Sequence, residues 1–107
     1  MIITVRERKQ IADTILLQLG GTNKLGAMIG ASQFSYDDNG NVTFWFKGCR
    51  KANIIKVSLN GSDLYNIEFF KFNSRSYECK SVKTFTDVYN SDLQSVIEAY
   101  TGLYLSL

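Results

Sequence analysis

Hydrophobic residues near the beginning of the sequence recur with the spacing of an α-helix. Between residues 7 and 19 they stand at Ile11, Ile15, Leu16 and Leu19. Positions four, five and eight apart lie on one side of a helix, so this spacing predicts an amphipathic helix. Gly20 and Gly21 follow directly and are expected to end it, because glycine readily adopts the left-handed conformation that closes a helix.

A second, shorter helix is predicted over residues 22–31. The residues that would face the core are Leu25, Met28 and Ile29. Thr22 or Asn23 is expected to cap the first turn, since both side chains accept hydrogen bonds from free helix N–H groups, and Gly30 is expected to end the helix. The glycines of this region do not follow the spacing of a phosphate-binding loop.

The middle of the chain changes to a period of two, which is typical of β-strands with one buried face. An Asp-Asn-Gly sequence separates the first two runs and is a strong hairpin signal. A three-residue loop with Gly40 in the left-handed region pairs Tyr36 with Val42. The same register places Phe34 opposite Phe44 and keeps the aromatic residues on one face, so we prefer it to a two-residue loop.

Three further strands are predicted, which makes about five in a row. They span residues 53–59, 64–72 and 77–85, with turns at residues 60–61 and 73–76. The side chains expected to point inward are Ile55, Val57, Leu59, Tyr65, Ile67 and Phe69. Because alternate residues of a strand lie on opposite faces, these residues would share the buried face of one sheet.

The helical period returns over residues 91–101. The apolar stripe consists of Leu93, Val96, Ile97 and Tyr100. Asp87 or Asn90 is expected to cap this helix and Gly102 to end it. Residues 103–107 contain three leucines and are too apolar to stay in water. We expect this tail to dock on the domain, or across a two-fold interface with a second copy as a homodimer.

These elements define an α+β protein with a single domain over residues 1–107. We expect an antiparallel meander of about five strands, with N-terminal helices (one long, one short) and a C-terminal helix packed on one face. The length of 107 residues and an apolar fraction of 45% suffice for one hydrophobic core. Proline is absent and no Gly/Ser-rich linker divides the chain, which agrees with one domain.

The composition points away from most enzyme classes. The chain has no histidine, which removes the commonest metal ligand and the usual general base. Cys49 and Cys79 stand 30 residues apart without a CxxC motif, so a zinc site is not supported. The aspartates of the predicted turn and of the last helix start have structural roles there. We therefore expect no catalytic residue, no metal, no cofactor and reduced thiols.

Positive charge is concentrated in the middle of the chain. Residues 39–83 hold eight Lys and Arg against three Asp and Glu, whereas residues 84–107 hold three acidic residues and no basic one. The loop over residues 47–52 is the densest basic segment. Side chains of this loop and of the outer sheet face next to it form the candidate binding surface: Trp45, Lys47, Arg50, Lys51, Lys56, Phe70 and Phe72.

Three interpretations of this surface remain open. Proteins that bind single-stranded nucleic acid interleave aromatic and basic side chains, because the rings stack on bases and the cations meet phosphates. The pattern here is loose and contains no RNP-type motif. We favour contact with another protein over nucleic acid, and the third interpretation is a sheet face that is covered or self-associates.

A set of short motifs runs through nearly the whole chain, from about residue 11 to residue 107. The motifs are Gln18-Leu19-Gly20-Gly21, Asn23-Lys24, Ala27-Met28-Ile29-Gly30-Ala31, Arg50-Lys51-Ala52-Asn53, Leu59-Asn60-Gly61, Asp63-Leu64-Tyr65, Val88-Tyr89, Leu93-Gln94 and Thr101-Gly102-Leu103-Tyr104. Their combination resembles a family of small proteins encoded by bacteriophages and prophages. That family has no established activity, so the resemblance implies no catalytic residues. It implies a phage accessory product made inside a bacterium.

The sequence thus predicts a non-catalytic phage accessory protein in the cytoplasm of the host. It would act by binding a host or phage protein, and we favour a host protein or complex, as an inhibitor of a defence or housekeeping machine would require. The alternative is a nucleic-acid-binding accessory protein that works through Trp45 and the basic loop. No stretch approaches the length of a membrane span, so no membrane is expected as a partner.

Overall fold

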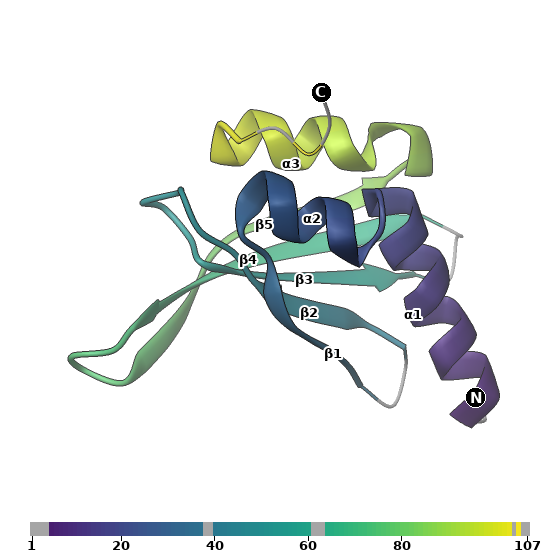
Figure 1. Cartoon of the computed structure of the whole chain (residues 1–107), viewed down its shortest axis with the longest axis horizontal. Helices are drawn as coiled ribbons and strands as arrows, with labels where there is room; N and C mark the ends of the chain where they lie inside the picture. The colour runs from purple at the N-terminus through teal and green to yellow at the C-terminus, as the bar shows by residue number, and fades with distance from the viewer. Residues whose placement is uncertain (1–4, 38–39, 61–63, 104, 106–107) are drawn as a thin grey trace.

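The described residues form three α-helices and one five-stranded sheet (Figure 1). The computed structural model describes residues 5–37, 40–60, 64–103 and 105, and for residues 5–8 it describes the backbone alone. In chain order the elements are α1 (Val5–Leu19), α2 (Thr22–Ile29), β1 (Ser32–Tyr36), β2 (Val42–Trp45), β3 (Ile54–Leu59), β4 (Tyr65–Asn73), β5 (Glu78–Val88), the 3-10 helix η1 (Asn90–Asp92) and α3 (Leu93–Thr101).

The sheet is an antiparallel meander in the order β1-β2-β3-β4-β5, which confirms the predicted α+β fold. The predicted register of the first hairpin is confirmed next to its loop, but the pairing shifts between Ser32 and Ser35. Tyr36 pairs with Val42, and Gly40 has a φ of 80°. The rings of Phe34 and Phe44 have centroids 5.1 Å apart, as expected for neighbours on one face. Residues 38 and 39 of this loop lie outside the described residues.

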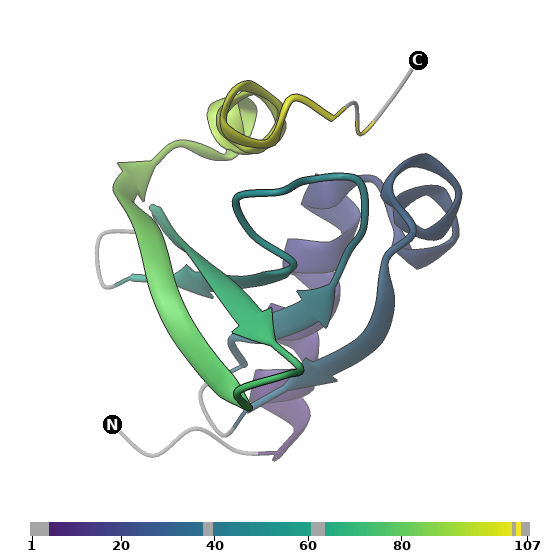
Figure 2. The same ribbon diagram turned by 90° about the vertical axis from the view of Figure 1, so that its left-hand side faces the viewer.

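All three helices pack on one face of the curved sheet, which we call the helix face (Figures 1 and 2). Five of the six side chains predicted to point inward are buried there, but the sixth, Leu59, is exposed at the rim, where its side chain is 38% accessible. They join helix residues in one hydrophobic cluster, whose largest fully buried members are Phe44, Phe69, Ile15, Leu19, Leu25, Ile55, Ile67, Leu93 and Leu105. Burial of these side chains holds the helices on the sheet.

Glycines end the two shorter helices as predicted, but the predicted N-terminal caps are wrong. Gly30 and Gly102 have φ values of 65° and 75° after α2 and α3. Gly21, which has no side chain to offer, occupies the position before α2, and no side-chain cap bond forms there. Asp92 precedes α3, also without a side-chain cap bond.

Asp87 has a different role from the predicted cap. Its carboxylate Oδ1 accepts a hydrogen bond of 2.9 Å from Asn60 Nδ2, and its N–H donates to Asn66 Oδ1 at 3.2 Å. These bonds hold Asp87 at a φ of 57°, in the left-handed region that favours glycine. The polar contacts therefore stabilise the bulged end of β5 against the turn between β3 and β4.

Strand β5 is longer than predicted and runs to Val88. Together with the end of β4 it forms a two-stranded ribbon that projects beyond the helices (Figure 1). We call residues 71–83 the arm. The register between the two strands shifts between Phe69 and Phe70, so that β5 carries one extra residue at Val82. Bulges of this kind are common at sheet edges, where they interrupt the ladder that another chain could extend.

The described residues of the C-terminal tail, Leu103 and Leu105, dock on the domain as predicted. Leu105 is 1% exposed and Leu103 packs against the same core cluster. The Leu105 N–H donates a hydrogen bond of 2.8 Å to Glu98 Oε2 on α3. Because its own chain already buries Leu105, this residue gives no reason for a second copy, and the homodimer stays a prediction. Tyr104, Ser106 and Leu107 lie outside the described residues.

Candidate binding surfaces

The face of the sheet opposite the helices, which we call the open face, carries a cluster of large apolar side chains. Trp45 of β2 pairs with Ile54 of β3, and Ile54 pairs with Phe70 of β4. The ring of Phe72 meets the Trp45 ring edge-on, with centroids 5.4 Å apart. We call these four residues the aromatic patch. Among the described elements, no helix lies over it (Figures 1 and 2).

The aromatic patch has a small core of its own. Ile54 lies on the same outward face as Trp45 and Phe70, yet its side chain is only 8% exposed. The half-buried rings of Trp45, Phe70 and Phe72 stand around it and shield it from water. The sequence alone did not predict this shielding, because it depends on the register of three strands.

The side chain of Asn53 fixes Phe72 in place. Its Oδ1 accepts a hydrogen bond of 2.8 Å from the Phe72 N–H, and its Nδ2 donates one of 3.0 Å to the Phe72 carbonyl oxygen. The Asn53 backbone N–H donates to the Phe70 carbonyl oxygen at 3.0 Å. The Asn53 carboxamide thus replaces the backbone hydrogen bonds that β3 would make to Phe72, because β3 itself begins only at Ile54. Two bonds to one backbone unit hold the ring of Phe72 against Trp45.

Polar residues border the patch on the open face. Thr43 pairs with Lys56, and Lys56 pairs with Glu68, so this row crosses three strands. Glu68 Oε2 accepts a hydrogen bond of 2.7 Å from the Ser81 hydroxyl on β5. The open face therefore has an apolar centre and a mixed polar border that contains charges of both signs.

The lysines of the basic loop do not lie on the open face. The aliphatic carbons of Lys47 lie 3.2–3.3 Å from the position that a side-chain carbon on Gly30 would take, at the end of α2. Lys51 Nζ lies 3.5 Å from the Tyr100 carbonyl oxygen and 5.1 Å from the centre of the Tyr100 ring, on α3. Both side chains therefore reach the helix face. Cations are favourable at the carboxyl ends of helices, which explains this placement.

The predicted surface thus splits into two parts. Trp45, Lys56, Phe70 and Phe72 come together on the open face, whereas Lys47 and Lys51 turn to the helix face. Arg50 is exposed in the loop between them. The expectation that lysines alternate with the aromatic rings is wrong for all but Lys56. In a strand the alternation of residues fixes the direction of each side chain, but in a loop it does not. The direction of a loop side chain depends on which partner lies nearby.

A second basic surface lies on the arm and was not predicted. Lys71 of β4 pairs directly with Lys80 of β5, and Lys83 pairs with Phe69. These positions follow the inward residues of β4, so the three lysines continue the helix-face side of the sheet. Lys71 and Lys80 border a hollow of about 200 Å³. The charge of these residues is evident in the sequence, but their juxtaposition depends on the bulge at Val82.

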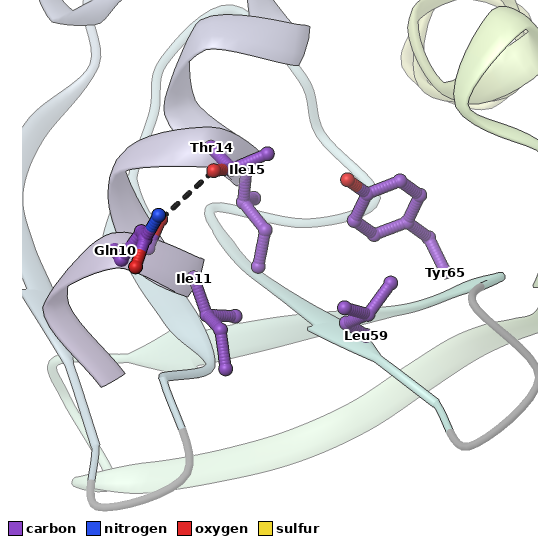
Figure 3. A pocket seen from close by; sticks show the side chains of 6 residues that line it. All are labelled: Gln10, Ile11, Thr14, Ile15, Leu59 and Tyr65. Carbon is purple, nitrogen blue, oxygen red and sulfur yellow. Dashed lines mark hydrogen bonds between the residues drawn. The ribbon is translucent and has the colours of Figure 1, made fainter. Parts of the chain in front are cut away.

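A hollow of about 320 Å³ lies between α1 and the turn end of β3 and β4 (Figure 3). Its described lining consists of Gln10, Ile11, Thr14, Ile15, Leu59 and Tyr65. Thr14 Oγ1 donates to the Gln10 carbonyl oxygen at 2.9 Å and is thereby used within α1. Burial raises the pKa of the Tyr65 hydroxyl. The described lining holds no pair of acid and base, so its chemistry does not suggest a reaction.

The remaining reactive groups are scattered. Cys49 is a half-buried free thiol beside the core, and Cys79 is an exposed free thiol on the arm. Within the described residues, no three Cys, Asp or Glu side chains gather in a way that could hold a metal ion. No described helix is long and apolar enough to cross a membrane.

Comparison of the chain with protein-family models, with curated proteins and with solved structures found no match. The resemblance to a phage-encoded family therefore stays a prediction from the sequence motifs.

Proposed function

We propose that the protein is a non-catalytic phage accessory protein that binds a host protein or protein complex in the bacterial cytoplasm. The phage origin rests on the motif resemblance alone. The observation that supports binding is the aromatic patch on the open face. Large apolar side chains at the centre of a surface, with a polar border, are typical of protein interfaces.

The composition of the open face favours a protein partner over single-stranded nucleic acid. Base stacking requires accessible ring faces with cations close by. Here Trp45 and Phe72 pack against each other, and of the predicted lysines only Lys56 lies on this face. Lys56 is also directly opposite Glu68, whose charge would repel a phosphate. The partner that fits is an apolar protein surface with polar groups of both signs at its border.

Site-specific photo-crosslinking in a bacterial host tests this proposal. A photoreactive residue replaces Thr43 on the open face, and a matched protein carries it at Lys24, which is exposed on α2. We expect one discrete crosslinked protein from position 43 that survives nuclease treatment and is absent from position 24. We also expect the substitution Trp45→Ala to abolish this product. Equal products from both positions, no product at all, or a product lost with nuclease would contradict the proposal.

A further inference from the structure

The arm projects from the body as a two-stranded ribbon with a free tip (Figure 1). Every residue from position 73 to position 84 is exposed. At the tip, Tyr77 is 84% exposed and has a φ of 56°. The neighbouring turn is shaped by a hydrogen bond of 2.9 Å from the Arg75 N–H to Asn73 Oδ1. A ribbon this exposed adds little to the core, so its side chains are free to serve a contact.

The charges of the arm are mostly positive. Residues 71–83 contain four basic residues, Lys71, Arg75, Lys80 and Lys83, and one acidic residue, Glu78. Four positive charges and one negative charge give a net charge of +3 on thirteen residues. Glu78 forms an ion pair of 3.3 Å with Lys80, but both side chains are mostly exposed. Exposed pairs of this kind contribute little to stability. Glu78 offsets one of the four positive charges, which the net charge of +3 already counts, and it borders the same hollow as Lys71 and Lys80.

The pairing of Lys71 with Lys80 is unfavourable for the protein on its own. Like charges directly opposite each other on neighbouring strands destabilise a sheet. Protection of an exposed edge against aggregation explains lysines on β5, because edge strands commonly carry them. It does not explain Lys71, which lies on β4, or Arg75 at the tip. An anion bound between the two strands would remove the repulsion.

The shape of the arm identifies which anion fits. The strands of a ribbon lie about 4.8 Å apart, and the major groove of B-DNA, about 12 Å wide, admits a two-stranded ribbon. A ribbon in this groove is flanked by phosphates on both sides. We propose that the arm binds the phosphate backbone of duplex DNA independently of its sequence, with Lys71, Lys80, Lys83 and Arg75 facing the phosphates. Phe72 belongs to both the arm and the aromatic patch, but Lys71, Lys80 and Lys83 lie on the opposite side of the sheet from its ring. The inference does not depend on the proposed protein partner.

Binding of the full-length protein to a fluorescent 30-base-pair duplex of mixed sequence tests this inference. Four phosphate contacts predict a slope of about −3.6 for log affinity against log salt, or a loss of about 100-fold between 50 and 200 mM salt. The arm variant is Lys71→Glu with Lys80→Glu, which keeps a like-charge pair across the strands. The control variant is Lys9→Glu with Lys24→Glu, which changes the net charge equally on α1 and α2.

We expect the arm variant to lose at least about 30-fold in affinity at low salt. The two substitutions remove two contacts with DNA phosphates and add two negative charges that repel them. The control should stay within about threefold of the original protein. Both variants should melt cooperatively, since all four positions lie at the surface. Equal losses in the two variants, no binding by the original protein, or tighter binding to single strands than to the duplex would each overturn the inference. The crosslink from position 43 should be unaffected by the arm variant, so the two proposals fail separately.

Discussion

Gly48 and Gly26 show how one residue type can have opposite effects in this fold. Gly48 has a φ of 92°, and a side-chain carbon there would stand 3.0 Å from Leu103 Cδ2. Gly26 lies inside α2, where a side-chain carbon would meet only the Ala31 carbonyl oxygen at 3.6 Å. We expect Gly48→Ala to destabilise the protein by about 1–2 kcal/mol or more, because backbone strain and the close contact add.

For Gly26→Ala the expected change is a stabilisation of about 0.5–1 kcal/mol, since alanine is the better helix former. Thermal or denaturant unfolding of the two variants measures both effects. A Gly48→Ala protein that is as stable as the original would contradict the tail packing described here.

Tyr65 gives the protein a dependence on alkaline pH. The side chain is 5% exposed, and burial raises the pKa of its hydroxyl above the ordinary value. The folded protein then holds this proton more tightly than the unfolded chain. The stabilisation is fully present below about pH 10 and is lost as the pH rises through the higher folded pKa.

The substitution Tyr65→Phe should flatten this alkaline loss while leaving stability at neutral pH nearly unchanged. Within the described residues the hydroxyl makes no hydrogen bond, so its removal leaves no partner unsatisfied. Denaturant unfolding between about pH 8 and 11, on either side of the ordinary tyrosine pKa of about 10, measures the difference. Identical pH profiles for the two proteins would rule out this role of Tyr65.

Residue-level predictions from the sequence succeed where a strand or helix period fixes a side chain. Ile67 and Phe69 are buried and Trp45 and Phe72 share the open face, as the period of two requires. Lys51 was placed wrongly because its partner, Tyr100, is 49 residues away in the chain. Local sequence carries no signal for such a contact.

At the scale of the elements, the tail behaves as part of the core. Leu105 is 1% exposed and lies in the same cluster as residues of the sheet and helices. We expect Leu105→Ala to cost about 2–5 kcal/mol, which is the range for large-to-small substitutions in a core. The control is Leu17→Ala, at a side chain that is 75% exposed on α1, and it should change stability by less than about 0.5 kcal/mol. Equal melting temperatures for the two variants would show that the tail does not contribute.

The order and type of the elements could be read from the sequence, but some ends could not. Helices that stop at glycine ended where expected, at Gly30 and Gly102. The end of β5 was missed by three residues, since Asp87 stands in the left-handed region only because Asn60 and Asn66 hold it there. An aspartate at this place in a sequence is typical of a turn, so the strand was predicted to end before it.

At the scale of the whole molecule, the side chain of Gln94 connects α3 to α1, which lie near opposite ends of the described chain. Gln94 Nε2 on α3 donates a hydrogen bond of 2.9 Å to the Gln18 carbonyl oxygen on α1. We expect Gln94→Ala to cost about 1 kcal/mol, because the bond is partly buried. Amide hydrogen exchange should quicken in the last turn of α1 and the first turn of α3 together. The control Ser95→Ala, at an exposed position of α3, should change neither the stability nor the exchange rates. Faster exchange in α3 alone after Gln94→Ala would contradict the coupling of α1 to α3.

The meander also sets the order in which the protein can fold. Each strand pairs with the next strand along the chain, so every rung of the sheet closes only a short loop. Contact between α1 and α3 instead joins residues 76 positions apart, as the bond between Gln94 and Gln18 shows. Because folding is faster when contacting residues are near in sequence, we expect hairpins to form first and the two flanking helices to meet last. A partly folded chain would therefore have its strands paired while α1 and α3 are not yet in contact.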